Sequence, residues 1–553
     1  MTIAYKKLFW LITLCLVVSQ FNFGQESQKK IVRQHNADLL KIVKLDNTSL
    51  VELRGNVELE HNGWFITCDL AYLNKKENYF DAYNNVKITK SDSVSIFSDT
   101  LHYMGNKDMA KFRSNVIVIN DSLTLTTNIL DYNTETSIGN YYQHGKLVNE
   151  DNILESKEGE FRQNKDEYIF FRDVVLYNNE YVMYTDSLRH LSERELSYFY
   201  GKTSMFGDDK EMYCNKGWYN SKLKVGEAED DVEMYSEGKQ LKAQYVFFND
   251  STGYNKALRN VEMLDTAQSI ILRGNRVEYF KDPEKVFATD SAMIIHAGEV
   301  DSLYLHADTL MMCTYEFTDS LKRKLIADKI VDSAQVAEDT LYREFYGYYG
   351  VRFFKSDMQG KCDSLFVSSI DTTIFMFEQP VLWTGKNQLS ADQIVIHTEN
   401  QAAKQVDFLN SAFIIQEDTV EVYNQVKGKN LYAYMVNGEL DKAEVKKNCQ
   451  TVYYVKEEAD YTGIYNTESV DINVYFENGN NIKTITFVGT PKTVLYPINQ
   501  AEETNKILKG FNWQDAIRPK TKNDVFLDIE IEKNPDENKA DKTKNSKLSS
   551  TKK

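Results

Sequence analysis

The sequence predicts an all-β protein built from tandem repeats, in which pairs of antiparallel strands stack into an elongated sheet that folds over on itself. Three observations support this prediction. Short motifs recur about every 29 residues, apolar residues alternate with period two inside each motif, and 35 Tyr and 29 Phe stand against only 6 Pro in 553 residues. Aromatic residues suit a half-buried pleated surface, and scarce proline leaves the backbone donors of a sheet intact.

The chain begins with the pattern of a secretory signal peptide. Lys6 and Lys7 precede an apolar run from Leu8 to Val18 that only Thr13 interrupts. This run is shorter than the roughly 20 residues that a membrane helix needs. We therefore expect residues 1–24 to be removed, with cleavage near Gly24 and Gln25, and the mature chain to lie outside the cytoplasm.

The first motif is an Asn or Asp followed by Val-x-apolar, as in Asn56-Val57-Glu58-Leu59 and Asn85-Val86-Lys87-Ile88. We call the residue after the Asn or Asp the valine position. It recurs at residues 57, 86, 116, 147, 174, 203, 232 and 261, with weaker copies at Leu147 and Thr203. Most of these steps are 29 residues long, which indicates a structural repeat.

The second motif is clearest in Ser98-Asp99-Thr100-Leu101-His102-Tyr103. Its polar position recurs at Asp69, Asp99, Asn128, Lys157, Asp186, Asn215 and Gln244. In six of these seven repeats the next valine position follows 17 residues later, and only the step from Asn128 to Leu147, at 19, departs. The two motifs therefore belong to one repeating unit.

Alternation with period two predicts strands with one apolar face, because residues two apart share a face of a sheet. A pair of such strands cannot bury that face alone, so successive repeats must stack. His102, Asp131 and Lys216 are predicted to point away from the apolar face. The candidates for the inward-facing lining are Val57, Leu59, Val86, Ile88, Leu101, Tyr103, Val116, Val118, Leu130, Tyr132, Val174 and Leu176.

Later copies of the repeat are less regular, and the gap from Asp308 to Val351 is 43 residues rather than 17. We therefore predict an inserted loop, which could separate two stacked lobes and contains a segment compatible with a short helix or a strand. The tail is rich in Lys, Asp, Asn and Ser, a composition typical of disorder. The predicted organisation is a signal peptide (1–24), β-repeats (25–312), an inserted loop (313–345), further β-repeats (346–518) and a disordered charged tail (519–553).

Recognised reaction chemistry is absent from the sequence. The net charge of −17 argues against a nucleic-acid partner. The eight His residues are scattered without zinc-ligand spacing, and no nucleophile elbow or phosphate-binding glycine loop occurs. Cys68, Cys214 and Cys362 occupy a small-residue position of the repeat, which favours a structural role. We expect no catalytic residues, no metal and no cofactor.

The signal peptide followed by tandem units such as Gly55-Asn56-Val57-Glu58-Leu59 and Ser98-Asp99-Thr100-Leu101-His102-Tyr103 resembles the OstA-like, LptA-type lipopolysaccharide-transport proteins, in the long form found in Bacteroidetes-type bacteria. The resemblance implies a periplasmic β-jellyroll that carries lipopolysaccharide with its acyl chains inside. It also implies a soluble bridge between inner-membrane extractor components and an outer-membrane β-barrel translocon, with head-to-tail self-association as a further option.

Two other functions remain open. One is a secreted structural scaffold without lipid cargo, and the other is a β-helical enzyme that degrades polysaccharide. An enzyme should concentrate acidic residues in a few repeats, whereas here they spread along the chain. If the lipid reading holds, a charge introduced at Tyr103 or Tyr132 should impair lipid capture more than a charge at His102.

Overall fold

The computed structural model of the chain describes residues 31–527 with short gaps. The predicted signal peptide and residues 528–553 of the predicted tail lie outside the described residues. Among the residues described, no helix is both long and apolar enough to cross a membrane. The gaps fall at 46–47, 91–93, 121, 150–151, 237, 268, 299–300, 328–340, 371, 400–401, 437–438, 459 and 478–480.

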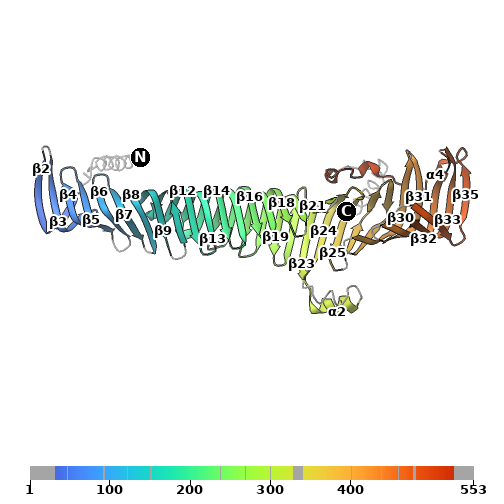
Figure 1. Cartoon of the computed structure of the whole chain (residues 1–553), viewed down its shortest axis with the longest axis horizontal. Coiled ribbons are helices and arrows are strands. Elements are labelled where there is room, and N and C mark those ends of the chain that lie inside the picture. Colours follow the sequence, from blue (N-terminus) through green and yellow to red (C-terminus); the bar gives the residue numbers. More distant parts are fainter. Residues whose placement is uncertain are drawn as a thin grey trace, which may run out of the picture. The chain divides into compact units, whose positions relative to one another are not determined.

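The described residues contain 35 strands, and every strand pairing given for them is antiparallel (Figure 1), which confirms the predicted all-β class. The chain divides into two compact units, residues 1–222 and residues 223–553. The predicted insertion therefore lies inside the second unit and does not separate two lobes. Its described part contains a short helix, α2 (Asp319–Ala327), between β23 and β24.

In the first unit, most strands form a hairpin with the next strand, while the short β10 and β11 both pair with β9 and β12. Two single-turn 3-10 helices, η1 (Gln163–Lys165) and η2 (Ser192–Arg194), occupy hairpin ends. The strands are β1 (Arg33–Asn36), β2 (Leu39–Leu45), β3 (Thr48–His61), β4 (Trp64–Asn74), β5 (Tyr79–Lys90), β6 (Val94–Met104), β7 (Met109–Asn120), β8 (Leu123–Asn133), β9 (Ile138–Val148), β10 (Asn152–Ser156), β11 (Glu158–Arg162), β12 (Glu167–Asn178), β13 (Tyr181–Leu191), β14 (Leu196–Gly207) and β15 (Lys210–Asn220).

The second unit continues the same hairpin pattern with more broken strands. It ends in a segment with the short helix α4 (Glu503–Lys506) and the 3-10 turns η3 (Asp515–Ile517) and η4 (Asp524–Phe526). The strands are β16 (Val225–Ser236), β17 (Lys239–Asn249), β18 (Tyr254–Asp265), β19 (Ile270–Lys281), β20 (Glu284–Thr289), β21 (Met293–Ala297), β22 (Ser302–His306), β23 (Thr309–Glu316), β24 (Leu341–Phe354), β25 (Gln359–Ser368), β26 (Thr373–Phe377), β27 (Val381–Thr384), β28 (Asn387–Ser390), β29 (Gln393–Glu399), β30 (Ala402–Thr419), β31 (Val422–Val436), β32 (Glu439–Glu457), β33 (Asp460–Glu477), β34 (Asn481–Val488) and β35 (Lys492–Pro497).

Each repeat contains a sharp corner just before the valine position. Asn84 and Asn85 have φ angles of 61° and 50°, and the register with β6 shifts between Tyr83 and Val86. Asn tolerates this left-handed conformation better than most residues. The Asn85 amide donates a hydrogen bond of 2.8 Å to Asp69 at the polar position of β4. The two sequence motifs therefore meet at the corner, which explains why they recur together.

The corners divide each unit into two facing layers. We call the first layer the half-strands before the corner on β3 and on the other strands that carry a valine position, together with the half-strands paired to them. The remaining half-strands form the second layer. In the first unit, the ring of Trp64 at the second-layer end of β4 lies 5.5 Å from the ring of Tyr132 in the first-layer half of β8. Strands four places apart in a flat sheet could not make this contact, because adjacent strands are about 4.8 Å apart. The sheet therefore folds over on itself, as predicted.

One assignment in the repeat was wrong. The left-handed residues of β9 are Gln143 and His144, so Gly145 rather than Leu147 holds the valine position. With Gly145 there, the step from Asn128 is 17 residues, as in the other repeats. A Cβ atom at residue 145 would overlap the ring of Tyr141. The motif was hard to recognise because in this repeat the ring of Tyr141, four residues before the valine position, occupies the space that a valine side chain fills in other repeats.

The C-terminal segment of the second unit packs on the outer face of the second layer (Figure 1, red). Gln388 on β28 donates to Asn512 O and accepts from Gln514 N, both at 2.7 Å. Gln425 on β31 makes the same pair of bonds with Lys506 O and Leu508 N. Val525 is fully buried against Met293 and Ile295. The chain thus packs past residue 519, where the charged tail was predicted to begin.

Candidate functional site

The twelve residues predicted to face inward are all buried. They come from alternate positions of β3, β5, β6, β7, β8 and β12, and they lie between the two layers of the first unit. His102, predicted to point away, is half-buried and hydrogen-bonds through Nδ1 to Asp81 at 2.7 Å. Strand parity therefore places these side chains correctly. Burial alone does not distinguish a lipid-facing lining from a dry core.

The interior of β3 to β8 is closed along the side opposite the corners. The His61 Nδ1 atom and the Tyr103 hydroxyl lie 2.7 Å apart, and that hydroxyl lies 3.2 Å from Thr134 Oγ1. The indole of Trp64 donates to Thr134 O at 3.2 Å. Burial raises the pKa of Tyr103 to about 12. We call these four residues the latch, because they join hairpin ends of the two layers.

Aromatic rings fill the space behind the latch. Phe80 stacks on Tyr103 with ring centroids 5.1 Å apart, and Trp64 meets Tyr132 edge to face. Tyr103 and Tyr132 are both 0% exposed. Such packing resembles the interior of an ordinary domain, where side chains interdigitate without room for a guest. In this stretch the predicted lining residues therefore form a core.

The interior opens farther along the first unit. Tyr103 and Tyr132 belong to a row of inner side chains in the first layer that recurs once per repeat, and the next members are Phe161, His190 and Tyr219. These three are half-buried rather than fully buried. Burial lowers the pKa of His190, which favours its neutral form. The same row therefore changes from a closed core to a partly open apolar surface.

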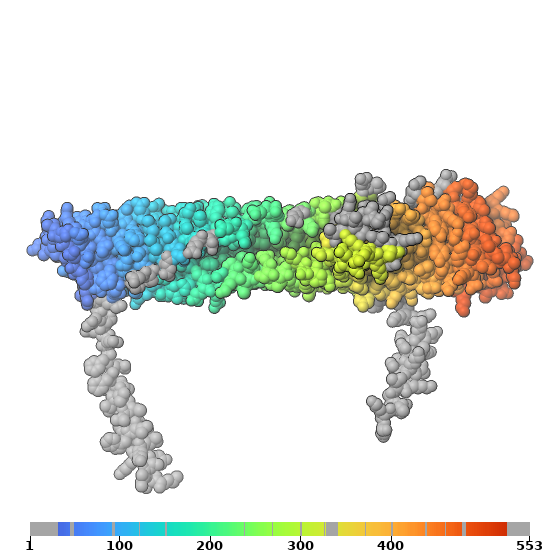
Figure 2. Space-filling view, turned by 90° about the horizontal axis from the view of Figure 1, so that it is seen from below, coloured from blue at the N-terminus to red at the C-terminus, as the bar shows by residue number. Residues whose placement is uncertain are grey.

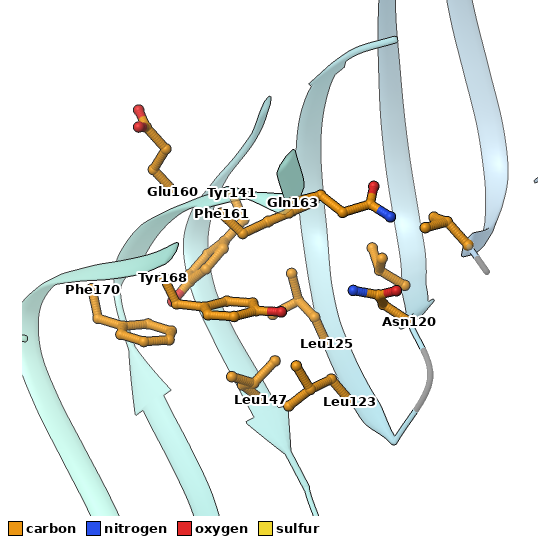
Figure 3. Close-up of a pocket in the computed structure, with 12 residues that line it drawn as sticks. Asn120, Leu123, Leu125, Tyr141, Leu147, Glu160, Phe161, Gln163, Tyr168 and Phe170 are labelled. Carbon is orange, nitrogen blue, oxygen red and sulfur yellow. The ribbon is translucent and has the colours of Figure 1, made fainter. Parts of the chain in front are cut away.

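A pocket of about 470 Å³, including space open to solvent, marks this transition (Figure 3). The rings of Tyr141, Tyr168 and Phe170 and the side chains of Leu125 and Leu147 point into it (Figure 3). Its polar groups are few, and the Tyr132 hydroxyl donates to one of them, Gln163 Oε1, at 3.2 Å. The lining residues are Val94, Val118, Asn120, Leu123, Leu125, Tyr141, Leu147, Glu160, Phe161, Gln163, Tyr168 and Phe170.

Among the twelve predicted residues, only Val118 lines this pocket. Phe161 lies 29 residues after Tyr132, so the repeat itself contained the signal for this missed residue. Tyr141 and Phe170 occupy the position four residues before the valine position, which also repeats. The sequence motif did not include that position because its residue type varies.

In the second unit the inner face is also partly open. Leu241 and Phe248 on β17 and Met263 on β18 are half-buried, although they occupy inner positions. Figure 2 shows a furrow along the green strands of this unit. The apolar interior therefore reaches the surface as a trough between the layers.

Two properties of the described residues bear on reaction chemistry. No group of His, Cys, Asp and Glu among them could hold a metal ion. Burial raises the pKa of Cys68, Cys214 and Cys362 to about 12 in each case. Thiols with such pKa values are poor nucleophiles at neutral pH. The site is suited to binding an apolar ligand.

The family comparison agrees with this arrangement. None of the curated proteins matches the chain. The model of the OstA-like protein family matches residues 28–186, which include the closed interior, the latch and the pocket. The matched segment is less than half of the chain; over residues 28–186 the chain is similar to OstA-like proteins, in agreement with the predicted resemblance.

Proposed function

We propose that this protein is a periplasmic carrier that holds the acyl chains of lipopolysaccharide in the trough between its layers and breaks no bond. The proposal rests on the way in which burial changes along one row of inward-facing side chains in the first layer. Tyr103 and Tyr132 are fully buried, whereas Phe161, His190 and Tyr219 leave an apolar surface partly open. A packed core would need no such opening.

The energy of binding would come from the hydrophobic effect. Removing a methylene group from water stabilises the complex by about 0.8 kcal/mol. A chain of about ten methylenes would therefore gain about 8 kcal/mol before the costs of ordering the lipid. This interaction has no direction, so net movement of the lipid along the trough requires an external energy source.

An exposed strand edge supports docking to other components. β2 is an edge strand of the first unit, and Leu39, Leu40 and Ile42 on it are 51%, 51% and 63% exposed. An open apolar edge tends to pair with another chain. We propose that such edges join the carrier to inner-membrane extractor components, to the outer-membrane translocon or to a further copy.

Site-specific photocrosslinking in the native cell tests the proposal. A photoreactive residue replaces Phe161 or His190 in the open stretch, Tyr103 in the closed stretch, or the outward His102, each in a separate variant. Adducts with lipopolysaccharide at Phe161 and His190, and none at Tyr103 or His102, are expected. The carrier function would be contradicted, and the scaffold favoured, if no inner position of an exported, folded protein yielded an adduct.

A further inference from the structure

The inner wall of the second unit differs from that of the first. The residue four places before the valine position faces inward, and it is Phe170 and then Phe199 in the last repeats of the first unit. In the first two repeats of the second unit this position is Ala228 and Ala257. Each replacement of Phe by Ala removes a benzene ring from the first-layer wall.

The neighbouring inner position does not restore this volume. The side chain two residues earlier is absent at Gly226, which faces the same side as Ala228. In the next repeat it is Asn255, which is half-buried. The inner side chains of β16 and β18 in the first layer are therefore small, and the rings of this wall are those of Phe248 on β17 and Tyr279 on β19. This leaves more room than a repeat in which Phe170 or Phe199 adds a further ring.

The opposite wall changes one repeat earlier. The residue two places after the valine position is Leu59 or Ile88 in the closed stretch, both fully buried. It is Met205 in the last repeat of the first unit and Met234 and Met263 in the second unit, all half-buried. Methionine is unbranched and polarisable, so it adapts to ligands of irregular shape better than leucine or isoleucine does. Small residues on one wall thus face adaptable residues on the other.

This widened stretch has an end within the second unit. Leu305, Phe353 and Leu382, on β22, β24 and β27, continue the second-layer row of Met263, and all three are buried, unlike Met263 itself. The furrow of Figure 2 runs along the green strands that precede them. The space between the two apolar walls is therefore larger over β16 to β19 than over the strands that follow, and we call this space the chamber.

We propose that β16 to β19 form a chamber in which the several acyl chains of one glycolipid molecule dwell, with Met234 and Met263 as its adaptable wall. This inference rests on the proposed function. If every repeat bound lipid equally well, no repeat would be occupied in preference to another. A wider repeat removes more acyl chains from water at once, so the hydrophobic effect favours binding there.

An occupancy map tests the chamber. A photoreactive residue is placed singly at Met234, at Met263, at Phe161 or at the buried Met376, and cells are irradiated after the energy supply for transport has been removed. We expect adduct yields at Met234 and Met263 about fivefold above that at Phe161, which corresponds to about 1 kcal/mol, and none at Met376. Equal yields at Phe161, Met234 and Met263 would disprove the chamber but not the carrier. An absence of adducts at every inner position would disprove the carrier itself.

A filling substitution gives a second test. Ala257→Phe introduces a ring like that of Phe199, which holds the equivalent position of an earlier repeat. This variant should lower the adduct yield at Met263 about tenfold and leave the adduct yield at Phe161 unchanged. Leu258→Phe adds a ring on the outer face of the same strand and serves as the matched control. Met263→Ile, which imitates Ile88, should lower the adduct yield at Met234 if Ala257→Phe does not fold. Unchanged yields in both chamber variants would contradict the inference.

Discussion

The residues at the corners set the repeat. Asn115 has a φ angle of 52°, and its amide donates a hydrogen bond of 2.7 Å to Asp99. The backbone there needs a residue that tolerates the left-handed region, and the side chain needs a polar group that reaches the preceding strand. Asn meets both needs, which explains why Asn or Asp so often precedes the valine position.

Replacing Asn115 with Val should therefore lower the free energy of unfolding of the first unit by about 1–3 kcal/mol, the cost of a β-branched residue in this conformation. Asn115→Gly should lose less, because glycine adopts positive φ without strain. Chemical denaturation of the two variants measures the difference. Equal losses would show that the hydrogen bond to Asp99, and not the backbone conformation, controls the corner.

Gly145 illustrates a residue whose importance the motif search missed. Tyr141 fills the corner of its repeat and hydrogen-bonds to Ser156, so no Cβ atom fits at residue 145. Gly145→Ala should lower the free energy of unfolding by about 1–3 kcal/mol, a typical cost of overpacking. Gly207→Ala is the matched control, because the nearest atom to its new Cβ would be 3.3 Å away. Thermal melting that ranks Gly207→Ala as the worse variant would contradict this account.

At the scale of elements, the latch joins hairpins from both layers with a buried tyrosine. Burial raises the pKa of Tyr103 from 10.0 to about 12, so the folded protein favours the neutral phenol. The unfolded chain releases this proton from about pH 10 upward. The stabilisation is therefore complete below pH 10 and is lost as pH rises toward 12.

We expect the free energy of unfolding to fall between pH 10 and pH 12 and to fall less steeply in Tyr103→Phe. Burial also raises the pKa values of Tyr141 and Tyr181 to about 12, so these residues should contribute to the pH dependence of the free energy of unfolding that remains in Tyr103→Phe. Denaturant titrations at several pH values measure the slopes. Identical slopes for both proteins would mean that Tyr103 is not buried in the folded state.

The C-terminal segment could not be predicted from the sequence, because it has neither the repeat nor the alternation of the strands. It is held by glutamines that satisfy its backbone groups. Gln388→Ala should free residues 512–514, since Asn512 O and Gln514 N both lose a partner. Hydrogen exchange should then speed up in that segment. Gln450→Ala is the control, because Gln450 hydrogen-bonds on an exposed surface to Glu468. Unchanged exchange in Gln388→Ala would contradict the assigned role.

At the scale of the whole molecule, alternation predicted which side chains face inward, and the repeat length predicted the stacked hairpins. Neither could show which repeats are closed. That property depends on contacts between hairpins of opposite layers, such as Trp64 with Thr134, which lie 70 residues apart in the chain. It also depends on side-chain volume at a position that varies between Phe170 and Ala257.

The central claim is that the open stretch of the trough holds lipid. The most direct measurement is the amount of lipopolysaccharide that copurifies with the protein from its native envelope, determined by mass spectrometry. We predict bound lipid with the wild type, about tenfold less with Phe161→Asp, and an unchanged amount with His102→Asp. No bound lipid in the wild type, or equal amounts in all three folded proteins, would contradict the account.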